Sequence, residues 1–126
     1  MKLNGIHHIA IIVSDYEKSK DFYVNKLGFS VASETYRAER RDWLLKLWVN
    51  DTTQLEIFGE EQPPKRVNRP EAAGLRHLAF AVESVEQTAA ALNRLGIPTE
   101  PIRTDTDGTH FTFFQDPDGL PLELHE

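Results

Sequence analysis

Hydrophobic positions recur in the same order in the two halves of the chain. Residues 5–13 are apolar on both faces and rich in β-branched side chains, which is typical of a strand, and residues 75–82 repeat the pattern. Each run precedes a segment in which apolar residues recur at helical spacing, and a glycine, Gly28 or Gly96, ends that segment. The matching order predicts an internal duplication with a period of nearly 70 residues.

Each predicted helix begins with a capping signal. Ser14 with Glu17, and Ser84 with Gln87, each place a serine three positions before an acid or an amide, the pattern of a capping box. The residues expected to face inward are Tyr16, Ser19, Phe22, Tyr23 and Leu27 in the first helix, and Val85, Thr88, Ala89, Leu92 and Leu95 in the second.

Three strand-like segments follow each predicted helix. They cover about 29–37, 42–49 and 53–58 in the first half, and about 98–103, 109–115 and 121–125 in the second. The fold class predicted is therefore α+β, with two tandem βαβββ modules over about 1–60 and 74–126. Prolines and charges mark residues of about 60–73 as a linker, and the 126-residue length predicts a single domain, 1–126.

Composition narrows the functional classes. The chain has no cysteine, which excludes disulfides, thiolate zinc sites and a cysteine nucleophile. A net charge of −6 argues against binding to a nucleic-acid backbone. Because no apolar run has the length of a signal or a membrane span, we expect a cytoplasmic protein that binds neither nucleic acid nor membrane.

Four residues occupy equivalent places in the two halves. His77 follows His8 by 69 residues at the start of a strand, and Glu123 follows Glu56 by 67 residues in the last strand. Each alone has an ordinary explanation, since such histidines are usually packed structural residues and such glutamates usually point to water. If the modules pair symmetrically, however, the four side chains converge, and a divalent cation is the simplest partner for two carboxylates and two imidazoles.

The donor set indicates the kind of metal. Mixed imidazole and carboxylate ligands suit Zn, Ni, Co, Mn or Fe(II) rather than Cu(I) or Ca. Strand alternation places His8 on the face of Ala10 and Ile12, and His77 on the face of Ala79. Because both faces of these first strands are apolar, we expect them to be buried on both sides.

The segments around these positions resemble a known family. They read HHIAIIVSD, KDFYVNKLGF, QLEIFG, GLRHLAFAV and DPDGLPLELHE. Over essentially its whole length the chain resembles the vicinal oxygen chelate superfamily and, within it, the glyoxalase I-like (lactoylglutathione lyase-like) proteins. The resemblance implies paired βαβββ modules that form an incomplete barrel around a divalent metal. It also implies that His8, Glu56, His77 and Glu123 are the metal ligands.

The same resemblance implies a chemistry. In glyoxalase I the metal, often Ni or Zn, binds both oxygens of a hemithioacetal of glutathione and methylglyoxal, and a glutamate moves a proton between adjacent carbons through an enediolate. By this resemblance the chain is a lyase or isomerase acting on a small carbonyl compound or its thiol adduct. Glu123 is the first candidate for the base, and Glu56 is the second. The superfamily also implies a homodimer.

Departures from the family pattern keep alternatives open. Ile12 stands where glyoxalase I has an arginine, and Glu60 stands where its bacterial forms have an asparagine that helps to hold glutathione, so the use of glutathione is open. Glu56 favours the lyase and isomerase branch over dioxygenases and transferases with two histidines and one glutamate. A metal-dependent dioxygenase or transferase, and a non-enzymatic binder of small molecules or drugs, are the alternatives.

Further residues have two interpretations each. Arg37, Arg40 and Arg41 form either a solvated charged loop or an anion clamp. Strand alternation places Phe111 and Phe113 on one face, where we expect them to form core and cleft wall.

Overall fold

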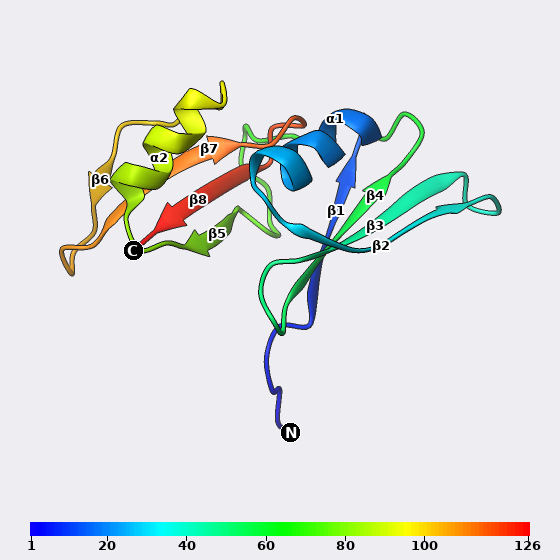
Figure 1. Ribbon diagram of the computed structural model, residues 1–126, viewed down its shortest axis with the longest axis horizontal. Helices are drawn as coiled ribbons and strands as arrows, with labels where there is room; N and C mark the ends of the chain where they lie inside the picture. The colour runs from blue at the N-terminus through cyan, green and yellow to red at the C-terminus, as the bar shows by residue number, and fades with distance from the viewer. The chain divides into compact units, whose positions relative to one another are not determined.

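The computed structural model describes residues 1–126, which divide into two compact units, Met1–Lys65 (unit 1) and Arg66–Glu126 (unit 2). In both, a strand is followed by a helix and then by three strands (Figure 1). The chain therefore consists of two βαβββ modules, as the hydrophobic pattern predicted. Each module has one four-stranded mixed sheet, and neither sheet closes on itself.

Unit 1 has a sheet with the strand order β1-β4-β3-β2. Its elements are β1 (His8–Val13), α1 (Tyr16–Lys20) continued by the π-helical turn η1 (Asp21–Lys26), β2 (Ser30–Arg37), β3 (Asp42–Trp48) and β4 (Gln54–Gly59). Strand β1 is parallel to β4, and the other pairs are antiparallel. The central position of β4 next to β1 brings the first and last strands of the module side by side.

The two helices begin differently from one another. Ser84 caps α2 (Val85–Arg94) as predicted, because its side chain accepts a hydrogen bond from the Gln87 backbone N–H at 3.2 Å. The prediction that Ser14 caps the first helix is wrong: Asp15 is the cap and accepts from the Lys18 N–H. A carboxylate caps as well as a hydroxyl, and its charge is favourable at a helix N-terminus.

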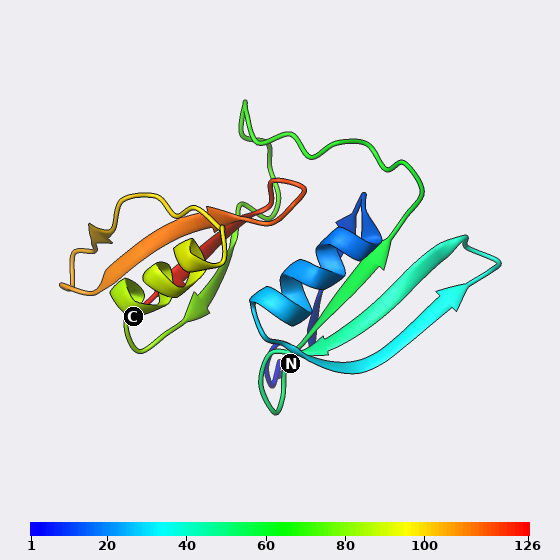
Figure 2. The ribbon, with the colours of Figure 1, turned by 45° about the horizontal axis from the view of Figure 1, so that its top comes forward.

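The core of unit 1 lies between the sheet and the helix (Figure 2). Its fully buried strand residues are Val13, Leu45, Leu47, Leu55 and Ile57, and Tyr23 of the helix packs among the buried residues. The opposite face of the sheet is open. The expectation that β1 is buried on both sides is therefore wrong within this unit, since His8 and Ala10 are exposed and Ile12 is 55% exposed.

Unit 2 repeats the arrangement with the strand order β5-β8-β7-β6. Its strands are β5 (Leu78–Ala81), β6 (Arg103–Thr104), β7 (His110–Gln115) and β8 (Pro121–His125). The inward stripe of α2 includes Val85, Ala89 and Leu92, as predicted. Leu95, which was also expected inside, is 47% exposed, because the helix ends there and Ile97 fills the core instead.

Strand β6 is much shorter than the predicted segment of about 98–103. Before β6, the chain is tied to β7 by individual hydrogen bonds rather than by a regular ladder. The Glu100 N–H donates to the Phe113 carbonyl, and the Thr112 hydroxyl donates to the Glu100 carbonyl. These bonds fix the position from which Arg103 enters the sheet.

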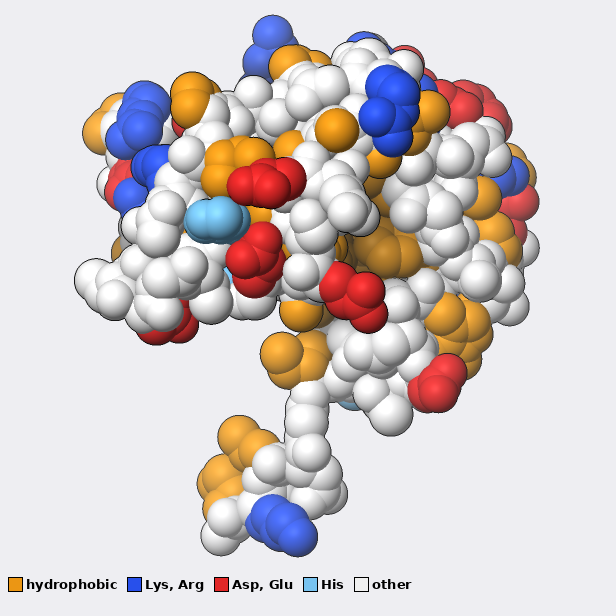
Figure 3. Space-filling model, turned by 60° about the vertical axis from the view of Figure 1, so that its left-hand side comes forward, with side chains coloured by type: hydrophobic (Ala, Val, Ile, Leu, Met, Phe, Trp, Pro, Cys, Tyr) orange, Lys and Arg blue, Asp and Glu red, His pale blue; other side chains and the backbone are white.

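The surface carries charges of both signs. On the face drawn in Figure 3, acidic and basic side chains are interspersed, and hydrophobic side chains reach the surface between them. None of the helices has the length and apolar character needed to cross a bilayer.

Candidate metal centre

Unit 1 brings together the first two of the four predicted ligands. Parallel pairing sets Ala10 of β1 opposite Glu56 of β4, and His8 lies two residues before Ala10 on the same face. The small alanine leaves space beside the ring. His8 Nδ1 lies 3.7 Å from Glu56 Oε2 and 2.9 Å from Nδ1 of His7. Although adjacent residues of a strand alternate in direction, this contact shows that the His7 ring turns towards its neighbour.

Unit 2 repeats the pairing with a shorter contact. Ala79 of β5 lies opposite Glu123 of β8, and His77 directly precedes β5. Its Nε2 lies 2.9 Å from Glu123 Oε2, which is hydrogen-bonding distance. The same strand register therefore produces a histidine–glutamate pair in each module.

The carboxylates are the better-buried members of both pairs. The exposed fraction of the side chain is 13% for Glu56 and 10% for Glu123, whereas His8 and His77 are 43% and 27% exposed. A shielded carboxylate is costly unless it has a partner. Lys46, directly opposite Glu56 in the sheet, forms no ion pair with it. A histidine is the ion-pair partner of each glutamate, and Arg37 and His125 act on Glu56 and Glu123 through their charge.

No group of three or more histidine, aspartate or glutamate side chains that could hold a metal lies together in the structure. The four predicted ligands thus occur as two pairs, one in each unit. Each pair has the imidazole and carboxylate chemistry that Zn, Ni, Co, Mn and Fe(II) accept. That all four bind one ion stays a prediction.

A large pocket in unit 2 adjoins the His77–Glu123 pair. Its volume is about 1210 Å³, and its lining includes both members of the pair together with Phe111, Phe113 and Arg103. Phe113 contacts His77 edge to face, with ring centroids 5.0 Å apart. The prediction that the two phenylalanines share a face and form a cleft wall is confirmed, because both line this pocket. The prediction that they belong to the core is wrong, since both are half-buried and Thr112 and Phe114 of the opposite face are buried instead.

Arg103 is a pocket residue that the sequence analysis did not select. Its guanidinium lies over the rings of Phe111 and Phe113, 5.1 and 5.3 Å from the centroids. Arg103 lies at the end of a predicted strand, but its neighbours depend on the pairing of that strand with β7, which sets Arg103 opposite Phe111. The sequence pattern along one strand does not specify this pairing.

The arginine cluster of unit 1 lines a second pocket, of about 630 Å³. Arg37 donates a bidentate pair of hydrogen bonds to buried Asp42, from Nε at 2.8 Å and from Nη2 at 2.6 Å. This guanidinium lowers the pKa of the Asp42 carboxyl. Arg41 pairs with Glu61 at 3.2 Å. Two of the three arginines considered for an anion clamp are therefore already paired with acids of the same unit.

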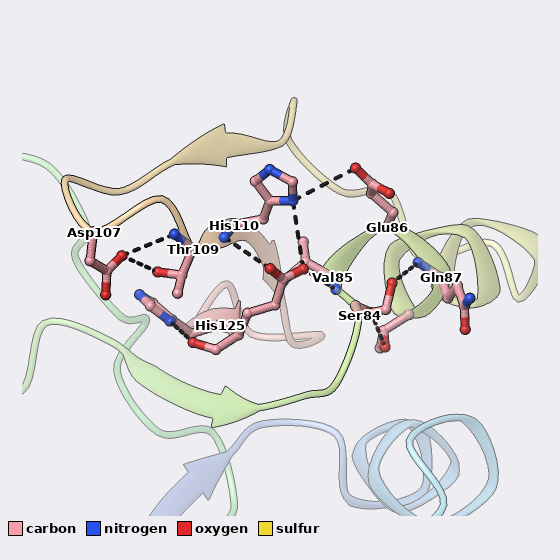
Figure 4. Close-up of polar contacts among 10 residues, drawn as sticks. Ser84, Val85, Glu86, Gln87, Asp107, Thr109, His110 and His125 are labelled. Carbon is pink, nitrogen blue, oxygen red and sulfur yellow. Dashed lines mark hydrogen bonds and ion pairs between the residues drawn. The ribbon is translucent and has the colours of Figure 1, made fainter.

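A polar cluster at the start of α2 was also missed by the sequence analysis. The Glu126 carboxylate accepts from the backbone N–H groups of Val85 and His110, and the His110 ring lies between Glu126 and Glu86 (Figure 4). These two N–H bonds lower the pKa of Glu126. The cluster ties the last strand to the helix and contains none of the predicted metal ligands.

Comparison with known proteins places this chain in a family. The model of the Glyoxalase/Bleomycin resistance protein/Dioxygenase superfamily matches residues 5–124. The chain therefore belongs to that superfamily.

The relatives include proteins of bacteria and of a protozoan. The chain is 60% identical to the uncharacterized protein YwkD of Bacillus subtilis, over 100% of this chain and 99% of the relative. A solved glyoxalase family protein from Enterococcus faecalis is 54% identical, with full coverage of both chains and a TM-score of 0.93. The trypanothione-dependent glyoxalase I of Leishmania major is 25% identical, with a TM-score of 0.78 and coverage of 98% of this chain and 87% of that one.

Proposed function

We propose that the protein is a metal-dependent, glyoxalase I-like lyase or isomerase that moves a proton between adjacent carbons of a small carbonyl substrate. The observation that carries the proposal is the repeated histidine–glutamate pair, formed by the same strand register in both modules. The likeness to the Leishmania major glyoxalase I, and to a probable lactoylglutathione lyase of Vibrio cholerae at 25% identity, supports this choice of chemistry.

His8, Glu56, His77 and Glu123 would hold the metal. Their two imidazole nitrogens and two carboxylates fit a divalent cation of the Zn, Ni, Co, Mn or Fe(II) kind. Each glutamate has one histidine as its ion-pair partner, so its carboxylate oxygens keep lone pairs with which to bind a cation. A cation bound there would stabilise negative charge that develops on the substrate oxygens.

Glu123 is the residue we propose to carry the proton. It is 7% exposed and lines the unit 2 pocket, where a substrate could reach its carboxylate. His77 fixes the carboxylate by its 2.9 Å contact, and Phe113 packs against that histidine. Glu123 would take the proton from the carbon beside the carbonyl and return it to the neighbouring carbon. Glu56, in the equivalent place in unit 1, is the alternative base.

Recognition of the thiol part of a substrate is proposed to differ from that in glyoxalase I. Ile12 is 55% exposed on the open face of unit 1, where it offers an apolar surface instead of a cation. Glu60 lines the small pocket of that unit and brings an acid where the bacterial glyoxalase I pattern has an asparagine. Neither Ile12 nor Glu60 supplies the contact to glutathione that this pattern implies, so thiol-free carbonyls and other thiol adducts are equal candidates.

The test is metal analysis followed by a substrate screen. Protein purified without added metal is assayed by elemental analysis and then incubated in D₂O with α-ketoaldehydes, alone and as adducts of glutathione and other thiols. Metal-dependent uptake of deuterium at carbon is the expected result, with a 2-hydroxyacyl thioester as the product from a thiol adduct and a 2-hydroxy acid as the product from the hydrate of a free α-ketoaldehyde. Activity that instead needs Fe(II) and O₂ would indicate a dioxygenase, and metal-free protein that binds ligand unchanged would indicate a binder.

We also propose that the protein is a homodimer, as members of this superfamily often are. Sedimentation equilibrium at micromolar concentration tests this directly. A mass equal to one chain across the whole concentration range would refute it.

A further inference from the structure

We propose that Arg103 binds an anionic group of the substrate, a carboxylate or a phosphate, at the wall of the unit 2 pocket. The inference rests on the proposed function, since it assigns a substrate class to the same site. Arg103 would then be a specificity residue that holds one end of the substrate, while its carbonyl end lies at the His77–Glu123 pair.

The sheet fixes where the guanidinium lies. Arg103 is paired with Phe111 across β6 and β7, and Phe113 follows two residues later on the same face. The guanidinium carbon is therefore close to both rings, at 5.1 and 5.3 Å from their centroids. A cation stacked on two aromatic rings is attracted by their negative faces and loses side-chain freedom before any ligand arrives.

One aromatic ring connects this arginine to the candidate metal centre. Phe113 is paired with Glu123 across β7 and β8, and its ring lies 5.0 Å from that of His77. Arg103 and Glu123 thus lie on strands separated by one intervening strand, roughly 10 Å apart across the sheet. A substrate with an acid group several bonds from its carbonyl could contact both residues.

The guanidinium of Arg103 keeps donors available for a ligand. Stacking uses the face of the planar group and leaves its N–H edge, the edge that matches carboxylate and phosphate oxygens. Its only charged partner is Glu100, at 3.5 Å from Nη2. Both side chains are more than half exposed, and an ion pair of that kind is weak enough for a ligand anion to replace it.

The other arginines of the pocket lining differ from Arg103 in how they are held. Arg66 donates to Asn68 and to two backbone carbonyls, which holds the segment before β5 in place. Arg69 and Arg76 share Glu71, and their side chains are 84% and 71% exposed. Arg103 is the lining arginine whose guanidinium is held in position by aromatic rings of the pocket wall.

Binding of small anions to metal-free protein tests the proposal without requiring turnover. EDTA-treated protein is titrated with phenylphosphonate, phenylacetate and benzyl alcohol, which share an apolar ring and differ in charge. Binding is followed by NMR, including the Arg103 Nε–H signal. We expect the two anions to shift that signal and the neutral alcohol not to do so. Tighter binding of the phosphonate indicates a phosphate substrate, and tighter binding of phenylacetate indicates a carboxylate.

Substitutions assign the effect to one residue. Arg103→Gln should weaken anion binding at least tenfold, and Arg103→Lys should restore part of it. Arg94→Gln, which removes an exposed arginine from the last turn of α2, is the matched control and should bind as wild type. Equal binding to Arg103→Gln, equal binding of the alcohol, or no binding of either anion would overturn the proposal.

Metal analysis separates this proposal from the function on which it rests. Metal content of Arg103→Gln should equal that of wild type, because Arg103 is not a predicted ligand. If wild-type protein proves unable to bind metal, the proposed function fails while the anion titration still reports on Arg103. An unchanged backbone NMR spectrum away from the pocket shows that the variant is folded.

Discussion

Nε2 of His77 lies 2.9 Å from a carboxylate oxygen of Glu123, although 46 positions separate the two residues in the chain. The parallel pairing of β5 with β8 produces this contact by setting Glu123 opposite Ala79, two residues from the histidine. The same register in unit 1 leaves His8 3.7 Å from Glu56. Duplication has therefore preserved the strand register, and the distances within the two pairs differ.

Removal of the unit 2 imidazole should abolish metal binding. His77→Ala deletes one proposed ligand and removes the ion-pair partner of Glu123, so we expect loss of stoichiometric metal. Elemental analysis of the purified variant measures this. His110→Ala removes a histidine from the cluster at the start of α2 and should leave metal content unchanged. Undiminished metal in His77→Ala would rule out the proposed ligand set.

Conversion of the proposed base to an amide should separate binding from chemistry. Glu123→Gln keeps the shape of the side chain but cannot accept a proton, so kcat on a substrate found by the screen should fall by about 10²- to 10⁴-fold. Steady-state kinetics measure the loss. Glu83→Gln, an exposed glutamate of the same unit, provides the control. An unchanged kcat in Glu123→Gln would move the role to Glu56 or to another group.

The Asp15 cap of the first helix should contribute measurably to the free energy of unfolding. Asp15→Ala removes the acceptor of the Lys18 N–H and should lower the free energy of unfolding by about 1 kcal/mol. Asp15→Asn keeps an acceptor and should cost much less. Urea denaturation compares the two variants with wild type. Equal stabilities of Asp15→Ala and wild type would show that the side chain does not cap.

The close approach of β4 to the helix should make Gly59 intolerant of a side chain. A Cβ at this position would lie 2.8 to 3.0 Å from three side-chain carbons of Tyr16, whose ring stacks on Trp43. Gly59→Ala should therefore destabilise the protein by about 1–3 kcal/mol. Gly5→Ala introduces a Cβ into open space and is the control. Thermal unfolding that is the same for both variants would contradict this packing.

Stability should fall in acid partly through Glu126. The backbone N–H of Val85 donates to its carboxylate and is the main cause that lowers its pKa below the ordinary value of 4.5; the N–H of His110 adds to this effect (Figure 4). A group whose pKa is lower in the folded state stabilises the fold above its unfolded pKa, and this contribution is lost as the pH falls through the folded value. Glu126→Gln should therefore show a shallower loss of stability below about pH 4.5, measured by urea denaturation across that range.

Much of the fold was predictable because the sequence patterns that specify its strands and helices lie within single short segments. The recurrence of strand and helix periods gave both βαβββ modules, and Ser84 and Gly96 gave the ends of α2. The errors arose where two local signals competed. Asp15 lies next to Ser14 and caps the helix in its place, and Leu95 continues the apolar period of α2 past the point where the helix stops.

The sequence by itself determined the duplication and the segment that carries each candidate ligand, because these follow from periods of 2 and 3.6 residues along one segment. The strand predicted over 75–82 is shorter in the structure, so that His77 lies just before β5. Tertiary structure decided which residues lie beside each ligand. Strand pairing set the 2.9 and 3.7 Å contacts of the two pairs, left one face of the unit 1 sheet open, and placed Arg103 over two phenylalanines. Such contacts depend on the register between segments that are distant along the chain, which no local pattern specifies.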